Sequence, residues 1–106
     1  MQTIENINNT IQENMAVMVY FSAPSCNVCH ALKPKLIEAL EANFPDFKVE
    51  SVDISETEEI APHFNVFAIP TILIYLDGKE FFRKSRNMSV DEVIREIRRP
   101  YEIMTS

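Results

Sequence analysis

Apolar residues follow two different spacings along this chain, and the two alternate. Four short runs are rich in branched and aromatic residues and too brief for helices, which predicts β-strands at residues 16–22, 47–54, 71–76 and 79–84. Between and beside them, apolar residues recur every three to four positions, which predicts helices at residues 3–14, 26–43, 55–64 and 89–99. The expected order is helix, strand, helix, strand, helix, strand, strand, helix.

Local signals mark several helix ends. Thr3 and Ser55 are expected N-caps, because their hydroxyls can accept hydrogen bonds from the first free backbone amides. Ser89 and Glu92 have the spacing of a capping box at the start of the last helix. Pro100 is expected to end that helix, since proline disfavours a helical residue before it and has no N–H to donate.

The connections between strands predict the sheet. A helix joins the first two strands, with a bend expected at Pro34, so those strands should be parallel. Asp77-Gly78 is a strong hairpin signal, so the last two strands should be antiparallel. The expected strand order is second, first, third, fourth, with the third antiparallel to its neighbours. The chain is therefore expected to form one α/β domain over residues 1–106, a central mixed sheet of four or five strands flanked by helices on both faces.

Composition narrows the possible partners. The chain has 106 residues, of which 46% are hydrophobic and 25% charged, and a net charge of -6. A negative surface repels phosphate backbones, so no nucleic-acid partner is expected. No apolar run reaches the length of a membrane span, and the N-terminus lacks the pattern of a signal peptide, so the expectation is a cytoplasmic monomer without a membrane partner.

Cys26 and Cys29 are the only cysteines, and they stand as C-x-x-C where the first strand runs into a helix. Such a pair serves as a dithiol that cycles with a disulfide, as half of a zinc site or, because His30 follows, as a c-type haem attachment. At a helix N-terminus, free amides and the helix dipole favour a thiolate over a thiol. This placement favours redox chemistry.

The two other uses of the motif have weaker support. A structural zinc site needs four ligands, and the remaining candidates, His30 and His63, lack the spacing of a zinc finger. Haem attachment requires export and an axial partner. No metal or cofactor is therefore expected.

Four features occur together at characteristic spacing: residues 20–29 (Tyr-Phe-Ser-Ala-Pro-Ser-Cys-Asn-Val-Cys), Pro34, Ile-Pro-Thr at 69–71 and Asp77-Gly78. This ordered set resembles the thioredoxin family over nearly the whole chain. The resemblance implies a thioredoxin-like fold in which Pro70 is cis and faces the cysteines. The resemblance also implies that Cys26 is the exposed nucleophile and Cys29 the resolving thiol. The substrate groove is expected to include Ser25, Ile69, Pro70 and Arg86.

The chain departs from the family pattern around the cysteines. The intervening dipeptide is Asn27-Val28, whereas thioredoxins carry Gly-Pro, and Ser25 replaces their tryptophan. Tyr20 stands where thioredoxins have a buried aspartate, and Arg86 where their groove usually has glycine. Tyr20 and the neighbouring His30 are therefore candidates for tuning the site.

The predicted function is that of a small thiol–disulfide oxidoreductase that reduces protein disulfides through a Cys26–Cys29 dithiol/disulfide cycle. Its expected partners are protein disulfides and an electron donor such as a disulfide reductase. The alternative is a thioredoxin-shaped module that binds a partner and has weak or no redox turnover.

Overall fold

The computed structural model describes residues 2–106, and its elements follow the predicted order. The helices are α1 (Ile4–Glu13), α2 (Asn27–Asn43), α3 (Ile60–His63) and α4 (Val90–Thr105). The strands are β1 (Ala16–Ser22), β2 (Phe47–Asp53), β3 (Thr71–Leu76) and β4 (Lys79–Ser85). None of the helices within residues 2–106 combines the length and the apolar character needed to cross a membrane.

The four strands form one sheet in the order β2-β1-β3-β4, as predicted. β1 is parallel to β2, and β3 is antiparallel to both β1 and β4. The hairpin between β3 and β4 turns at Asp77-Gly78, where both residues have positive φ angles of 54° and 80°. A turn with this twist matches the twist of the flanking strands, which is why this dipeptide signals a hairpin.

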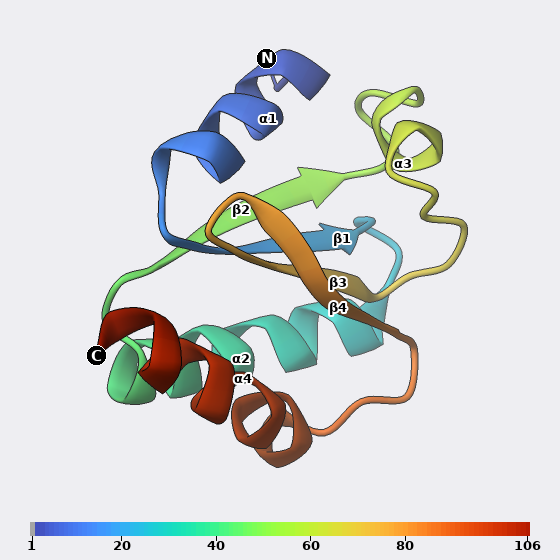
Figure 1. Cartoon of the computed structure of the whole chain (residues 1–106). Helices are drawn as coiled ribbons and strands as arrows, with labels where there is room; N and C mark the ends of the chain where they lie inside the picture. Colours follow the sequence, from blue (N-terminus) through green and yellow to red (C-terminus); the bar gives the residue numbers. More distant parts are fainter. Residues whose placement is uncertain (1) are drawn as a thin grey trace.

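Helices cover both faces of the sheet, so the molecule has three layers (Figure 1). α2 and α4 pack on one face over a core that includes Tyr20, Leu36 and Ile97, and α1 and α3 pack on the other over Phe21 and Ile60. β1 lies in the centre and is buried on both faces, with only Ser22 partly exposed. Because β1 ends at Ser22, the loop that carries Cys26 starts from the buried centre of the sheet.

The prediction for the third helix is wrong at its start. Helix α3 spans only Ile60–His63, and Ser55 does not cap it. The carboxylate of Asp53 accepts hydrogen bonds from the amide of Ser55 (2.9 Å) and from its hydroxyl (2.6 Å). This local turn uses the groups that would have capped a helix, so residues 55–59 form a loop.

The prediction that the last helix ends before Pro100 is also wrong. Helix α4 continues through Pro100 to Thr105, although proline removes one helical hydrogen bond. Tyr101 supplies the compensating energy: its ring lies 4.7 Å from that of Phe44, and its hydroxyl donates a 3.0 Å hydrogen bond to Asp46. Tertiary packing of this buried aromatic residue outweighs the local cost of the proline.

Candidate active site

The two cysteines lie at the junction of β1 and α2. The amide of Cys26 donates a 3.0 Å hydrogen bond to the carbonyl of Ala23, which closes the turn after the strand. Cys26 is the N-cap of α2, one residue before the position predicted for it in the first turn. Its side chain is therefore placed among the free amides at the start of the helix, where negative charge on sulfur is favoured.

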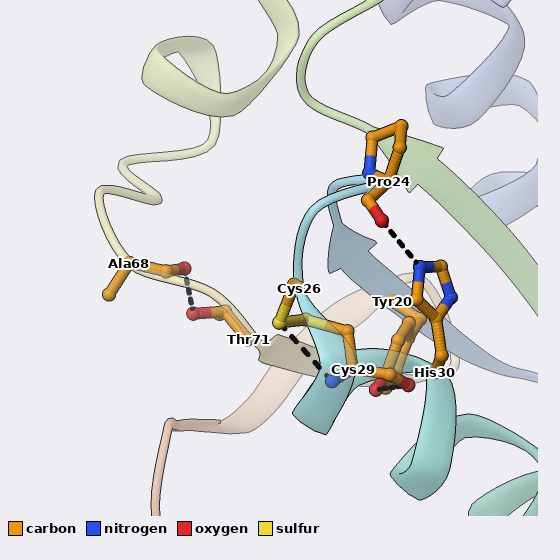
Figure 2. Close-up of a disulfide and its surroundings, with 7 residues drawn as sticks. All are labelled: Tyr20, Pro24, Cys26, Cys29, His30, Ala68 and Thr71. Atoms are coloured by element: carbon orange, nitrogen blue, oxygen red, sulfur yellow. Dashed lines mark hydrogen bonds between the residues drawn. A yellow bond between two sulfur atoms is a disulfide. The ribbon is translucent and has the colours of Figure 1, made fainter.

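Cys26 and Cys29 form a disulfide, with their Cα atoms 5.3 Å apart (Figure 2). Cys26 remains partly exposed, whereas Cys29 is 1% exposed and packs in the core under α2. The amide N–H of Cys29 donates a 3.2 Å hydrogen bond to Sγ of Cys26. In the reduced protein, the same donor would face the Cys26 thiol or thiolate sulfur. The two sulfurs thus have different access to a partner.

Tyr20 lies directly beneath the cysteines and is completely buried. Its hydroxyl donates a 2.8 Å hydrogen bond to the carbonyl oxygen of Cys29 (Figure 2). Burial raises the pKa of Tyr20 to about 12, because an ionised phenolate would lose its hydration. The hydroxyl therefore stays protonated near neutral pH and acts as a donor.

His30 is exposed, and its contact is with the active-site loop. Its Nε2 lies 3.0 Å from the carbonyl oxygen of Pro24, so a protonated Nε2 donates to that oxygen (Figure 2). This bond joins the first turn of α2 to the loop that precedes Cys26. The geometry favours a role in fixing the loop.

The segment before β3 lies in the surroundings of the disulfide, where the family resemblance places the opposite wall of the site (Figure 2). The Ile69–Pro70 peptide bond is cis, as the family resemblance predicted. Pro70 is buried and Ile69 partly so, and Ala68 lies in the surroundings of the disulfide (Figure 2). Ser25, on the loop before the cysteines, is exposed.

Arg86 follows β4 and holds this segment through its backbone. Its amide donates a 2.7 Å hydrogen bond to the carbonyl of Pro70. Arg86 has a positive φ of 60°, a conformation that glycine adopts more readily than other residues. The side chain of Arg86 is exposed beside this wall.

Thr71 and Ser85 take part in the site, and sequence reasoning missed both. The buried Thr71 hydroxyl donates a 2.6 Å hydrogen bond to the carbonyl of Ala68 and lies 2.8 Å from the Ser85 hydroxyl. The Thr71 hydroxyl has a single hydrogen, which it uses in the bond to the Ala68 carbonyl. The Ser85 hydroxyl is therefore the donor of the second bond, and Thr71 accepts it. The relay fixes the loop that carries Pro70. Counting outward from the hairpin turn would have paired Thr71 with residue 84, but a register shift between Ile74 and Tyr75 pairs it with Ser85.

Within residues 2–106, no three His, Cys, Asp or Glu side chains gather in an arrangement that could hold a metal ion. The chemistry visible at the site is that of the two sulfurs. Paired at bonding distance at a helix N-terminus, they can pass between dithiol and disulfide.

Comparisons with known proteins agree with this geometry. The thioredoxin family model matches residues 1–99. The thioredoxin-like protein YdfQ of Bacillus subtilis is 31% identical over 103 residues, which cover 97% of this chain and 91% of that protein. A thioredoxin of Chlamydia trachomatis is 33% identical over 93 residues, which cover 88% of this chain and 89% of its own.

Solved structures give the same result. Thioredoxin 1 of Thermosipho africanus has a TM-score of 0.75 and 36% identity to this chain, and the match covers 85% of this chain and 99% of that one. None of these comparisons favours a module that binds partners without redox turnover. With its C-x-x-C disulfide on this fold, the protein is a thiol–disulfide oxidoreductase, and the chain belongs to the thioredoxin family.

Proposed function

We propose that the protein reduces disulfides in other proteins, with Cys26 as the attacking thiol and Cys29 as the resolving thiol. The observation that carries this assignment is the difference between the two sulfurs. Cys26 is partly exposed, and its sulfur accepts a hydrogen bond from the amide N–H of Cys29, whereas Cys29 is 1% exposed. A client disulfide can approach only a sulfur that solvent can reach.

The reaction proceeds in two exchange steps. The Cys26 thiolate attacks one sulfur of the client disulfide, the client S–S bond breaks, and the leaving client thiolate takes up a proton. Cys29 then loses its proton and attacks Sγ of Cys26, which releases the second client thiol and forms the Cys26–Cys29 disulfide. Two electrons pass from the protein to the client, and an external dithiol donor restores the reduced pair.

The groove residues are assigned to binding. Ile69 and Pro70 would lie against the client backbone, while Ser25 and Arg86 border it. The Thr71 hydroxyl and the Arg86 amide support this role, because they hold the carbonyls of Ala68 and Pro70 and so fix the shape of the loop. His30 and Tyr20 act on the protein side of the site, through Pro24 and the Cys29 carbonyl.

The direction of the reaction depends on the surroundings. We assign the protein to a reducing compartment such as the cytoplasm, where a disulfide reductase would keep the pair reduced. We also propose that it works as a monomer, since both sulfurs and the opposite wall are supplied by one chain.

The direct test is reduction of insulin disulfides with dithiothreitol as donor. The parent protein should accelerate the reduction, and the Cys26→Ser variant should not. The Cys29→Ser variant, reduced beforehand and then freed of dithiothreitol, should stop after one exchange with insulin and accumulate as a mixed disulfide. Reduction that continued at the parent rate in the Cys26→Ser variant would refute the assignment of the nucleophile.

A further inference from the structure

An apolar hollow adjoins the active site on the side of α3. It has a volume of about 270 Å³, and its lining includes Ile54, Ala61, Val66, Phe67 and Ile69. Pockets that hold whole small molecules usually have volumes of about 300 to 1,000 Å³, so this one has room for a single bulky side chain. The lining comes from the segment between β2 and α3, from α3 itself and from the loop that runs to β3; Figure 1 shows where these elements lie.

The hollow is continuous with the groove through Ile69. This residue lines the hollow and precedes Pro70 in the cis peptide bond. It also packs against the core cluster on which Cys26 packs. A client segment lying along Ile69 and Pro70 would therefore pass the mouth of the hollow while its disulfide faces Cys26.

The lining of the hollow includes an exposed aromatic ring. Phe67 is 80% exposed. Single exposed apolar residues are common on proteins, but this one lines an apolar hollow. Covering it with an apolar client side chain would remove that surface from water.

Carboxylates stand beside the hollow. Glu58 lines it and also lines an adjoining surface depression with Glu56 and Glu59. Among the hydrogen bonds and ion pairs of residues 2–106, none involves these three side chains. The segment 54–69 contains no Lys or Arg, and Arg83, which reaches the Asn65 carbonyl, is paired with Glu80. The negative charge here is thus available to a partner.

We propose that the hollow and the Glu58 carboxylate form a specificity subsite that selects client proteins with a bulky apolar residue next to a Lys or Arg near the target cysteine. The apolar side chain enters the hollow against Phe67, and the cation faces Glu58. This inference rests on the proposed function, because it describes which disulfides the same site reduces. It concerns selection among clients, whereas the two exchange steps are unchanged.

The test uses four synthetic peptides, each joined to glutathione through one cysteine. They combine Leu or Ser at one position beside the cysteine with Lys or Glu at the next. The reduced full-length protein should show the highest kcat/KM for the Leu-Lys peptide, about tenfold above Ser-Lys from apolar burial. The kcat/KM for the Leu-Lys peptide should exceed that for the Leu-Glu peptide by up to about fivefold, which is the range of an exposed ion pair. The second ratio should fall at roughly 0.5 M salt, which screens exposed charges.

Two variants and their matched controls locate the effect. Phe67→Ser should reduce the preference for Leu, and Glu58→Gln should reduce the preference for Lys. Phe81→Ser removes another exposed aromatic ring on β4, and Glu102→Gln another exposed carboxylate on α4. Both control variants should keep the parent preferences. Equal kcat/KM for the four peptides, or preferences that survive in Phe67→Ser and Glu58→Gln, would overturn the subsite.

Bis(2-hydroxyethyl) disulfide separates the subsite from the redox function, since it carries neither a bulky apolar side chain for the hollow nor a cation for Glu58. If the parent reduces it while the peptides show no preference, the subsite is refuted and the proposed function stands. If the parent reduces neither this disulfide nor insulin, the proposed function fails, and binding alone decides the subsite. In that case, the Leu-Lys peptide with Ser in place of its cysteine should shift the backbone amide NMR signals of Ala61, Val66 and Phe67. Unchanged NMR signals would overturn the proposal.

Discussion

The amide N–H of Cys29 donates a 3.2 Å hydrogen bond to Sγ of Cys26, so the buried cysteine of the pair supports the exposed one. The sulfur in this disulfide stands in for the Cys26 thiol or thiolate of the reduced protein. Hydrogen bonds to an ionised acceptor are about twice as strong as neutral ones. The contact therefore favours negative charge on Cys26.

This relationship predicts which thiol reacts first. In the reduced protein, iodoacetamide should alkylate Cys26 well before Cys29, because Cys26 is partly exposed while Cys29 is 1% exposed. Peptide mapping after short exposures would give the order. The Cys26→Ser variant is the control and should react slowly at its remaining thiol. Faster modification of Cys29 in the parent would contradict the assigned roles.

The Thr71 hydroxyl predicts a combined effect on stability and turnover. Thr71→Val preserves the shape of the side chain but leaves the Ala68 carbonyl without its donor and Ser85 without its acceptor. The free energy of unfolding should fall by about 1 to 3 kcal/mol, and insulin reduction should slow as the loop loosens. Ser85→Ala is the matched control with a smaller expected loss, since it keeps the bond to Ala68. Urea denaturation of both variants tests this, and equal losses would show that the inner bond has no special role.

Much of the fold could be predicted because its signals are local. The Asp77-Gly78 turn needs only two residues with positive φ, and the helix between β1 and β2 requires them to run parallel. The site was visible for the same reason, since both cysteines lie within one turn of a single helix start.

The parts that sequence could not predict depend on distant partners. The chain beyond Pro100 stays helical because Tyr101 packs on Phe44 and bonds to Asp46, and no local pattern records that contact. The Thr71–Ser85 pair depends on a register shift inside the hairpin. The exposure of Phe67 is a property of the assembled surface.

The extension of α4 can itself be tested at Tyr101. Tyr101→Ala should lower the free energy of unfolding by about 3 kcal/mol or more, because it removes a buried aromatic ring. It should also reduce the helical circular dichroism signal, since the packing that carries the helix past Pro100 is gone. Ile103→Ala, at a position that is 64% exposed on the same segment, should change neither quantity much. If Tyr101→Ala retained full helicity, local propensity would have to explain the extension.

The raised pKa of Tyr20 predicts a stability loss at alkaline pH. The pKa is about 12 in the folded protein and 10 in its ordinary state, so the unfolded chain releases this proton first as the pH rises. Stability from the neutral phenol is complete below pH 10 and declines as the pH approaches about 12. Urea denaturation of the oxidised protein at several alkaline pH values should show a steeper decline for the parent than for Tyr20→Phe. Tyr75 and Tyr101 are present in both proteins, so parallel declines would refute this role of Tyr20.

We expect the same residue to limit the second exchange step, because in the proposed cycle Cys29 must lose a proton before it attacks Cys26. Tyr20 cannot accept that proton near neutral pH, since its pKa is about 12 and its hydroxyl already donates to the Cys29 carbonyl. Resolution should therefore be slow, and mixed disulfides should accumulate during turnover.

Tyr20→Asp would place a carboxylate at the position where thioredoxins carry one, and it should accelerate resolution by at least about tenfold, the lower part of what a positioned base contributes. Burial raises the pKa of such a carboxyl, so the acceleration should grow as the pH rises through neutrality. The variant should also be less stable than the parent, since a buried carboxyl without a partner is costly.

Tyr20→Asn is the matched control, because it leaves a similar cavity and adds no base. Mixed disulfides formed with a peptide–glutathione disulfide would be quenched in acid at successive times and quantified by mass spectrometry. If the folded Asp variant resolves them no faster than the Asn variant from about pH 6 to pH 9, removal of the Cys29 proton does not limit turnover.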